Sequence, residues 1–110
     1  MATTYKILGQ AAPSSTANAN LYTVPSATSA IVSTLTIVNT TTTAATARVF
    51  ARIAGAAAAT SNAIIYDATI QANSTASFTL GMTLATTDII TVQTGTSNAL
   101  TFTAFGSEIS

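Results

Sequence analysis

Short segments in which apolar and polar residues alternate constrain the fold of this chain most. The clearest is Ala30–Asn39, which reads Ala-Ile-Val-Ser-Thr-Leu-Thr-Ile-Val-Asn and contains no charge, Gly or Pro. Its β-branched side chains favour a strand over a helix, and a period of two is typical of a strand. The alternation predicts that Ile31, Leu35 and Ile37 share one face, while Val32 begins the other. Because both faces carry apolar residues, we expect a central strand.

The rest of the chain repeats this pattern between turn signals. No segment sustains the 3.6-residue period of a helix, so we expect about eight strands. Gly81 is expected to mark a bulge or a kink, and Gly95–Asn98 is expected to form a tight hairpin turn. The other expected strands are residues 5–8, 21–24, 47–54, 63–70, 76–80, 89–94 and 99–105.

Many short strands with regular turns predict an all-β, single-domain antiparallel β-sandwich over residues 1–110. We expect Ig-like, Greek-key connections, with a jelly roll as the alternative. Residues 10–20 are rich in Ser, Ala and Asn, contain Pro13, and are expected to form a loop or an extended arm. The expected core consists of Ile31, Leu35, Ile37, Val49, Ile53, Ile64, Phe78, Leu80, Ile90, Val92, Leu100 and Phe102.

The composition limits the classes of function. The three basic and three acidic residues sum to a net charge of zero, and little repulsion then opposes association. A basic patch is missing, which argues against nucleic acid as a partner. The N-terminal residues do not resemble a secretory signal, and no apolar run approaches the ~18 residues that a membrane-spanning helix needs. We therefore expect no nucleic-acid or membrane partner.

The residues that usually carry catalysis are scarce. The sequence contains no Cys and no His, so it offers neither a thiolate metal site nor a Ser-His-Asp triad. The carboxylates are Asp67, Asp88 and Glu108. Asp67 is expected on an outward strand face, and Asp88 in a turn where it accepts a backbone N–H. We expect no enzyme and assign no catalytic, cofactor-binding or metal-binding residue.

One outward strand face carries a candidate protein interface. Arg48, Phe50 and Arg52 alternate with smaller residues in the expected strand 47–54. Aromatic residues and Arg are enriched at the energetic centres of interfaces, which favours an exposed anchor. The alternative is that loops of the chain cover Phe50 and the arginines contact its ring. The sequence leaves both interpretations open.

Four segments resemble a known group of proteins. They are Leu-Tyr-Thr-Val-Pro at 21–25, Val-Ser-Thr-Leu-Thr-Ile-Val-Asn at 32–39, Thr-Leu-Gly-Met-Thr-Leu-Ala-Thr-Thr-Asp-Ile-Ile-Thr-Val at 79–92, and Phe-Thr-Ala-Phe-Gly-Ser-Glu-Ile at 102–109. Together they resemble small all-β virion structural proteins of tailed bacteriophages, including cyanophages. The resemblance extends from about Tyr5 to Ile109 and rests on strand and turn motifs.

The resemblance implies a non-enzymatic role in the virion. The expected function is a capsid decoration or cement protein that is made in the host cytoplasm and then binds and stabilises the head shell. It implies the major capsid protein or other virion proteins as partners, and a homo-oligomer, with a trimer as the first expectation. A tail or fibre module is the alternative. A carbohydrate-binding adhesin is a second alternative, for which Tyr22, Tyr66 and Phe50 are the candidate aromatic platforms.

Overall fold

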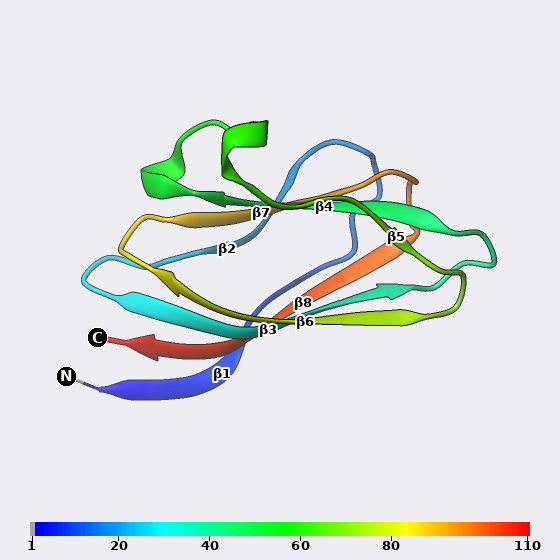
Figure 1. The fold of residues 1–110 in the computed structure, drawn as a ribbon. Coiled ribbons are helices and arrows are strands. Elements are labelled where there is room, and N and C mark those ends of the chain that lie inside the picture. The colour runs from blue at the N-terminus through cyan, green and yellow to red at the C-terminus, as the bar shows by residue number, and fades with distance from the viewer. Residues whose placement is uncertain (1) are drawn as a thin grey trace.

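Eight strands form two packed sheets in the computed structural model, which describes residues 2–110 (Figure 1). Two short 3-10 turns, η1 (Ile53–Gly55) and η2 (Thr60–Asn62), lie between the fourth and fifth strands. The expected strands at 63–70 and 89–94 have the predicted bounds, and most of the others are longer than expected. The strands are β1 (Thr3–Ala11), β2 (Ala19–Thr23), β3 (Ser29–Asn39), β4 (Ala45–Arg52), β5 (Ala63–Ile70), β6 (Thr75–Leu84), β7 (Ile89–Thr94) and β8 (Leu100–Ile109).

The strand order identifies the topology. The first sheet has the order β1-β8-β3-β6 and the second has the order β2-β7-β4-β5, with antiparallel neighbours throughout. The predicted all-β sandwich is therefore confirmed. Most connections pass from one sheet to the other, so the eight strands form a jelly roll, the alternative to the Ig-like order. As expected for a central strand, β3 lies between β8 and β6.

A row of bulges crosses the first sheet. Leu8 in β1, Ser33 in β3 and Leu80–Gly81 in β6 are extra residues in the pairing, all near the level of Phe105 in β8. The bulge expected at Gly81, where φ is +58°, is confirmed. The bulges in β1 and β3 change which residues of the strand face the interior, whereas the alternation in β6 continues unchanged across its bulge. In β1 and β3 the row therefore separates two halves of the strand whose alternation patterns are offset.

The core matches the prediction where the alternation is unbroken. Seven of the expected core residues are buried between the sheets: Leu35, Ile37, Val49, Ile90, Val92, Leu100 and Phe102. Phe78 and Leu80 are partly buried on β6. The remaining three expectations, Ile31, Ile53 and Ile64, are wrong because these residues are exposed.

Local backbone geometry explains each of these three corrections. The bulge at Ser33 offsets the alternation in β3, so Val32 faces the core and Ile31 does not. Ile53 leaves the strand, because β4 ends at Arg52 and Ala54 takes a φ of +51° in the following turn. In β5, a register shift between Ile65 and Ala68 places Ile65 rather than Ile64 in the core.

Two expected connections also differ. Gln10 and Ala11 belong to β1, and Ala19 and Asn20 belong to β2, so only residues 12–18 form a loop. This loop is tied to the body by hydrogen bonds to its carbonyl oxygens and is not an extended arm. The segment 95–98 is not a hairpin turn, because β7 and β8 lie in different sheets.

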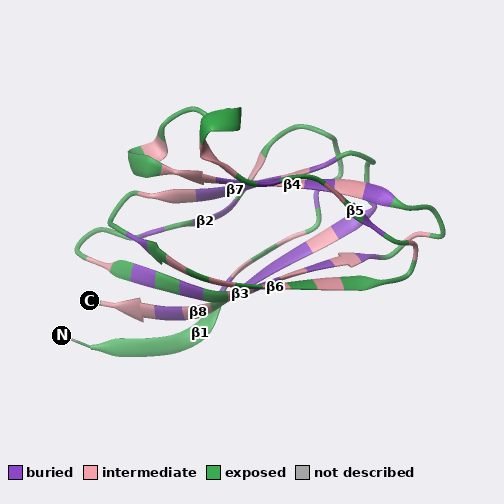
Figure 2. Ribbon diagram, in the orientation of Figure 1, coloured by how far each residue is buried: buried purple, intermediate pink, exposed green. Residues whose placement is uncertain are grey.

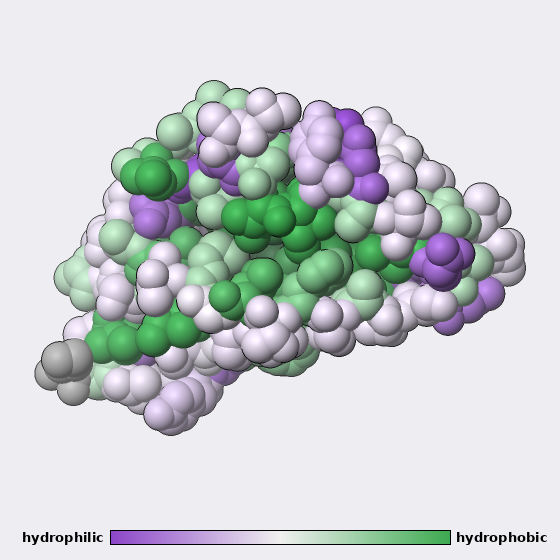
Figure 3. All heavy atoms as spheres, in the orientation of Figure 1, coloured by the Kyte–Doolittle hydropathy of each residue, from purple (hydrophilic) through white to green (hydrophobic). Residues whose placement is uncertain are grey.

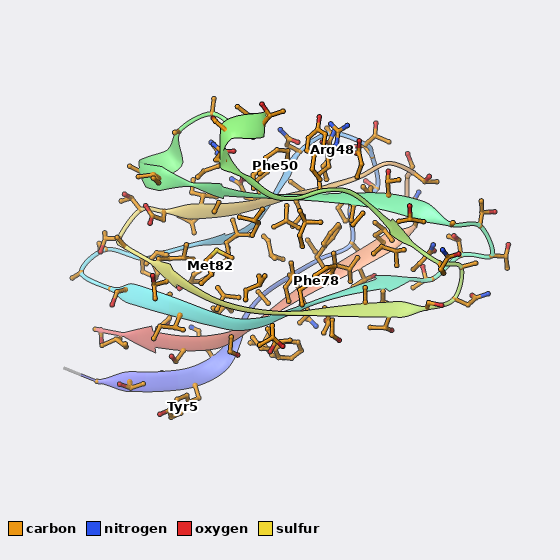
Figure 4. All side chains as sticks on the ribbon, in the orientation of Figure 1. Tyr5, Arg48, Phe50, Phe78 and Met82 are labelled. Atoms are coloured by element: carbon orange, nitrogen blue, oxygen red, sulfur yellow. The ribbon has the colours of Figure 1, made fainter. Side chains whose placement is uncertain are left out.

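The two flanks of the sandwich differ in closure. At Gly9 of β1 the backbone approaches β2 so closely that an added Cβ would lie 2.1 Å from the carbonyl oxygen of Leu21, which only glycine permits. On the opposite flank, β5 and β6 are the edge strands of the two sheets, and apolar atoms form a visible band across the middle of the molecule (Figure 3). Phe78 and Met82 of β6 point into the space between the sheets (Figure 4).

Candidate protein interface

Phe50 lies on the outer side of β4, below the connection formed by residues 53–62 (Figure 4). The residue is only 4% exposed. A hollow of about 240 Å³ remains beside it, lined by Arg48, Tyr66, Gln93 and residues 58–60 of the connection. The alternative in which loops of the chain cover Phe50 is therefore the observed arrangement in the isolated chain.

Arg52 is engaged with the chain itself. Its guanidinium donates hydrogen bonds to the carbonyl oxygens of Gly55 and Ala56, at 3.0 and 2.6 Å. It also donates to the Oδ1 atom of Asn20 and the Oγ1 atom of Thr91, at 3.2 and 3.0 Å. These bonds fasten the start of the 53–62 connection to the second sheet, so Arg52 helps to hold the cover over Phe50.

Arg48 also has partners within the chain. Its Nε and Nη2 atoms donate to the two carboxylate oxygens of Asp67 at 2.6 and 3.2 Å, and its Cζ atom lies 4.1 Å from the centre of the Tyr66 ring. A bulge in β5 brings Tyr66 and Asp67 together beside Arg48, and Asp67 has a φ of +55° there. The hydrogen bond from Arg48 lowers the pKa of the Asp67 carboxyl, and the same bond raises the pKa of Arg48.

The structure thus brings Arg48, Phe50 and Arg52 to one sheet face, as the alternation predicts. Their role as an interface remains a prediction. The predicted cation–π contact is made by Arg48, but with Tyr66 in place of Phe50. Of the three aromatic platforms expected for an adhesin, Phe50 and Tyr22 are buried and only Tyr66 is exposed.

The three carboxylates lie apart and have local partners. Asp88 accepts hydrogen bonds from the backbone N–H groups of Ala54 and Ala85, both at 2.9 Å, as expected for a turn residue. Asp67 is paired with Arg48 on the second sheet. Across residues 2–110, no three His, Cys, Asp or Glu side chains lie close enough together to hold a metal ion. The two short helical turns are far too small to cross a membrane.

The outer face of the first sheet carries a different surface, which we call the β1 patch: Tyr5, Ile7, Ile31 and Phe105. Tyr5 points away from the second sheet (Figure 4). Tyr5 pairs with Ser107 of β8, Ile7 pairs with Phe105, and Ile31 of β3 also pairs with Ser107. These four residues line a groove of about 610 Å³ together with Lys6, Ser33, Gly106 and Ser107, and it is larger than the hollow beside Phe50.

The row of bulges produces the β1 patch. Beyond the bulge at Leu8, five consecutive residues, Thr3–Ile7, are exposed although they pair with β8 (Figure 2). The bulge at Ser33 likewise moves Ile31 to the outer face. The sequence analysis did not identify this surface. The available signal was the alternation of Tyr5, Lys6 and Ile7 at the start of the chain, where apolar residues flank a charged one.

A polar cluster supports the opposite side of β1. The Nζ atom of Lys6 lies 2.9 Å from the Oε1 atom of Glu108, and the Tyr22 hydroxyl donates to the Oε2 atom of Glu108. The hydrogen bond from Tyr22, and to a smaller extent that from Lys6, lowers the pKa of the Glu108 carboxyl. Burial, followed by the bond to Glu108 and its charge, raises the pKa of Tyr22. The cluster ties β1 and β8 to β2 while the β1 patch stays apolar.

Comparisons with known proteins establish the fold. No protein-family model and no curated protein matches the sequence. Among solved structures, the chain is similar to one from "Structure of infectious bursal disease virus Gx strain", with a TM-score of 0.53 at 13% sequence identity. The match covers 97% of this chain and 31% of that chain, so this protein spans about a third of the viral chain's length. At this identity, the likeness shows a shared β-sandwich fold.

Proposed function

We propose that the protein is a non-enzymatic virion structural protein, and more specifically a capsid decoration or cement protein of a tailed bacteriophage. In this role it binds the major capsid protein or another virion protein on the outer surface of the head shell. It acts there as a homo-oligomer, with a trimer as the first expectation. A small module repeated over a shell can stabilise it through many weak contacts that act together.

The jelly-roll fold is the observation that carries this proposal. Jelly rolls form viral capsid domains, although they also form lectins and other proteins. The fold that this chain shares with a virus chain supports a virion role, and the resemblance of segments 21–25, 32–39, 79–92 and 102–109 to phage proteins points in the same direction. The neutral net charge and the exposed β1 patch suit a protein that works in an assembly.

The experiment locates the protein in purified phage particles by electron cryo-microscopy, after mass spectrometry has shown that the particles contain it. Extra density of this shape on the outer head shell is the expected result. Purified heads that lack the protein should also burst at a lower temperature and regain stability when it is added back. Density on the tail alone would overturn the decoration role and favour a tail or fibre module. Absence from particles would overturn the virion role.

A further inference from the structure

We propose that copies of this chain associate through the β1 patch, with Tyr5 of one copy seated in the groove of a second copy. This inference deepens the proposed function by naming the surface that joins the copies. It differs from the prediction of an Arg48, Phe50 and Arg52 interface, because Phe50 is already covered and Arg52 is bonded within the chain. The occupant proposed for the β1 patch is therefore a second copy of the protein.

The area of the β1 patch fits a protein interface. Tyr5 is 84% exposed, Ile7 51%, Ile31 37% and Phe105 36%. If a large apolar side chain offers on the order of 200 Å², these fractions amount to roughly 400 Å² of apolar surface. A standard interface buries about 800 Å² on each partner, of which a little over half is non-polar. The β1 patch can thus supply most of the apolar part of one side of such an interface.

The shape and charge of the β1 patch favour a copy of the same chain as the occupant. The most exposed side chain, Tyr5, stands beside a groove of about 610 Å³ that it helps to line, so the same surface carries both a projection and a recess. Two-fold symmetric dimers use such self-complementary surfaces, and a projection seated in the recess of the next copy can also close a ring such as a trimer. The nearest charge, Lys6, is paired with Glu108, so a charged partner gains little here. The net charge of zero leaves little repulsion between copies.

Face-to-face packing is favoured over the addition of a strand to the edge of β1. Lys6 lies within the exposed half of this edge strand, and lysine in an edge strand opposes pairing with another chain. Packing on the outer face leaves the pair of Lys6 and Glu108 undisturbed, because those side chains lie toward Tyr22 on the other side of the strand. It also buries the Tyr5 ring, which makes few contacts within its own chain.

The test measures molar mass by light scattering and sedimentation over a concentration series. The wild type should form an oligomer at roughly 100 μM. Tyr5→Asp should weaken association at least about 30-fold, the effect of losing a central aromatic anchor. Tyr66→Asp is the matched control, because it changes a half-exposed tyrosine on the opposite sheet and should leave the molar mass unchanged. Circular dichroism checks that both variants are folded.

A wild type that stays monomeric at that concentration would overturn the inference, as would a Tyr5→Asp protein that associates like the wild type. If Tyr5→Asp is unfolded, Ile7→Ser repeats the test with a smaller change in the same groove. Failure of this inference can be distinguished from failure of the proposed function. An oligomer that depends on Tyr5 but is absent from heads would leave the inference intact and overturn the decoration role, and a monomer found on heads would do the reverse.

Discussion

The outer faces of the two sheets show what a connection does to an aromatic residue in a strand. On the second sheet, residues 53–62 pass over β4, and Phe50 is buried below them. On the first sheet, Tyr5 and Phe105 remain exposed. The two faces contain similar residues, but the chain covers only one of them. Phe50 has its contacts within the chain, whereas the rings of Tyr5 and Phe105 are left exposed to solvent.

The arginines of the second sheet strengthen this contrast. Arg52 bonds to the connection that covers Phe50, and Arg48 bonds to Asp67 of the neighbouring strand. The first sheet places its charged pair, Lys6 and Glu108, on the side that faces Tyr22, so its outer face stays apolar. The arginines of the second sheet thus have their hydrogen-bond partners within the chain, and the β1 patch is the better candidate for binding a partner.

Removing the ring of Phe50 should have the largest effect on stability. Phe50→Ala is expected to lower the free energy of unfolding by about 3–5 kcal/mol, because it removes a buried ring and leaves a cavity below the connection. Tyr5→Ala, the matched loss of a ring on the uncovered face, should change it by about 0.5 kcal/mol or less. Urea denaturation of the two monomers measures the difference. Equal effects would contradict the contrast between the faces.

Removing the guanidinium that holds the connection should have an intermediate effect. Arg52→Ala is expected to lower the free energy of unfolding by about 1–3 kcal/mol, because the carbonyl oxygens of Gly55 and Ala56 lose their donor. Amide hydrogen exchange should also quicken in residues 53–62 more than in the first sheet. An unchanged exchange rate in this connection would show that Arg52 does not hold the cover in place.

The polar cluster below β1 should make stability depend on pH. The folded pKa of Glu108 lies below its unfolded value of about 4.3, so the unfolded chain binds more protons. This contribution is present above the unfolded pKa and is lost as the pH falls through the folded pKa. Glu108→Gln should reduce the loss of stability between neutral and acidic pH, measured by urea denaturation. Identical pH profiles of variant and wild type would exclude this role.

The exposed pair on the second sheet should matter least. Asp67→Asn removes the carboxylate that pairs with Arg48, and exposed ion pairs contribute little to stability. Screening this pair with added salt should accordingly change the unfolding midpoint of the wild type very little. A large loss of stability in Asp67→Asn would contradict this expectation. It would show that the bulge in β5, and with it the second sheet, depends on the ion pair.

Local patterns in the sequence predict the strands well. The alternation from Leu35 to Ile37 and from Ile90 to Val92 continues without interruption, and these residues are in the core. The prediction of buried residues fails where a bulge shifts the alternation without a glycine to signal it in the sequence. Ser33 and Asp67 carry no such signal, whereas Gly81 does, and its bulge was predicted. The exposure of Ile31 and Ile64 follows from these unpredicted shifts.

The order of the strands and the cover over Phe50 depend on contacts between distant residues. The residues at 95–98 do not by themselves distinguish a hairpin turn from a connection between the two sheets. The sequence therefore allowed the jelly roll only as an alternative to the Ig-like order. Whether Phe50 is covered likewise depends on the path of residues 53–62, where the run of four alanines is too short to form a helix of its own. The candidate residues could be assigned to one face from the sequence, but their degree of cover could not.

The pairing of β1 with β8 at the ends of the described chain has a mechanical consequence. The backbone N–H of Ala2 donates to the carbonyl oxygen of Ser110 at 2.8 Å, and the N–H of Ser110 donates to the carbonyl oxygen of Ala2 at 2.9 Å. A force that pulls these two residues apart loads the hydrogen bonds between the strands one after another, as in opening a zipper. The strand that carries Tyr5 would therefore peel away from β8 before the other strands of the first sheet separate.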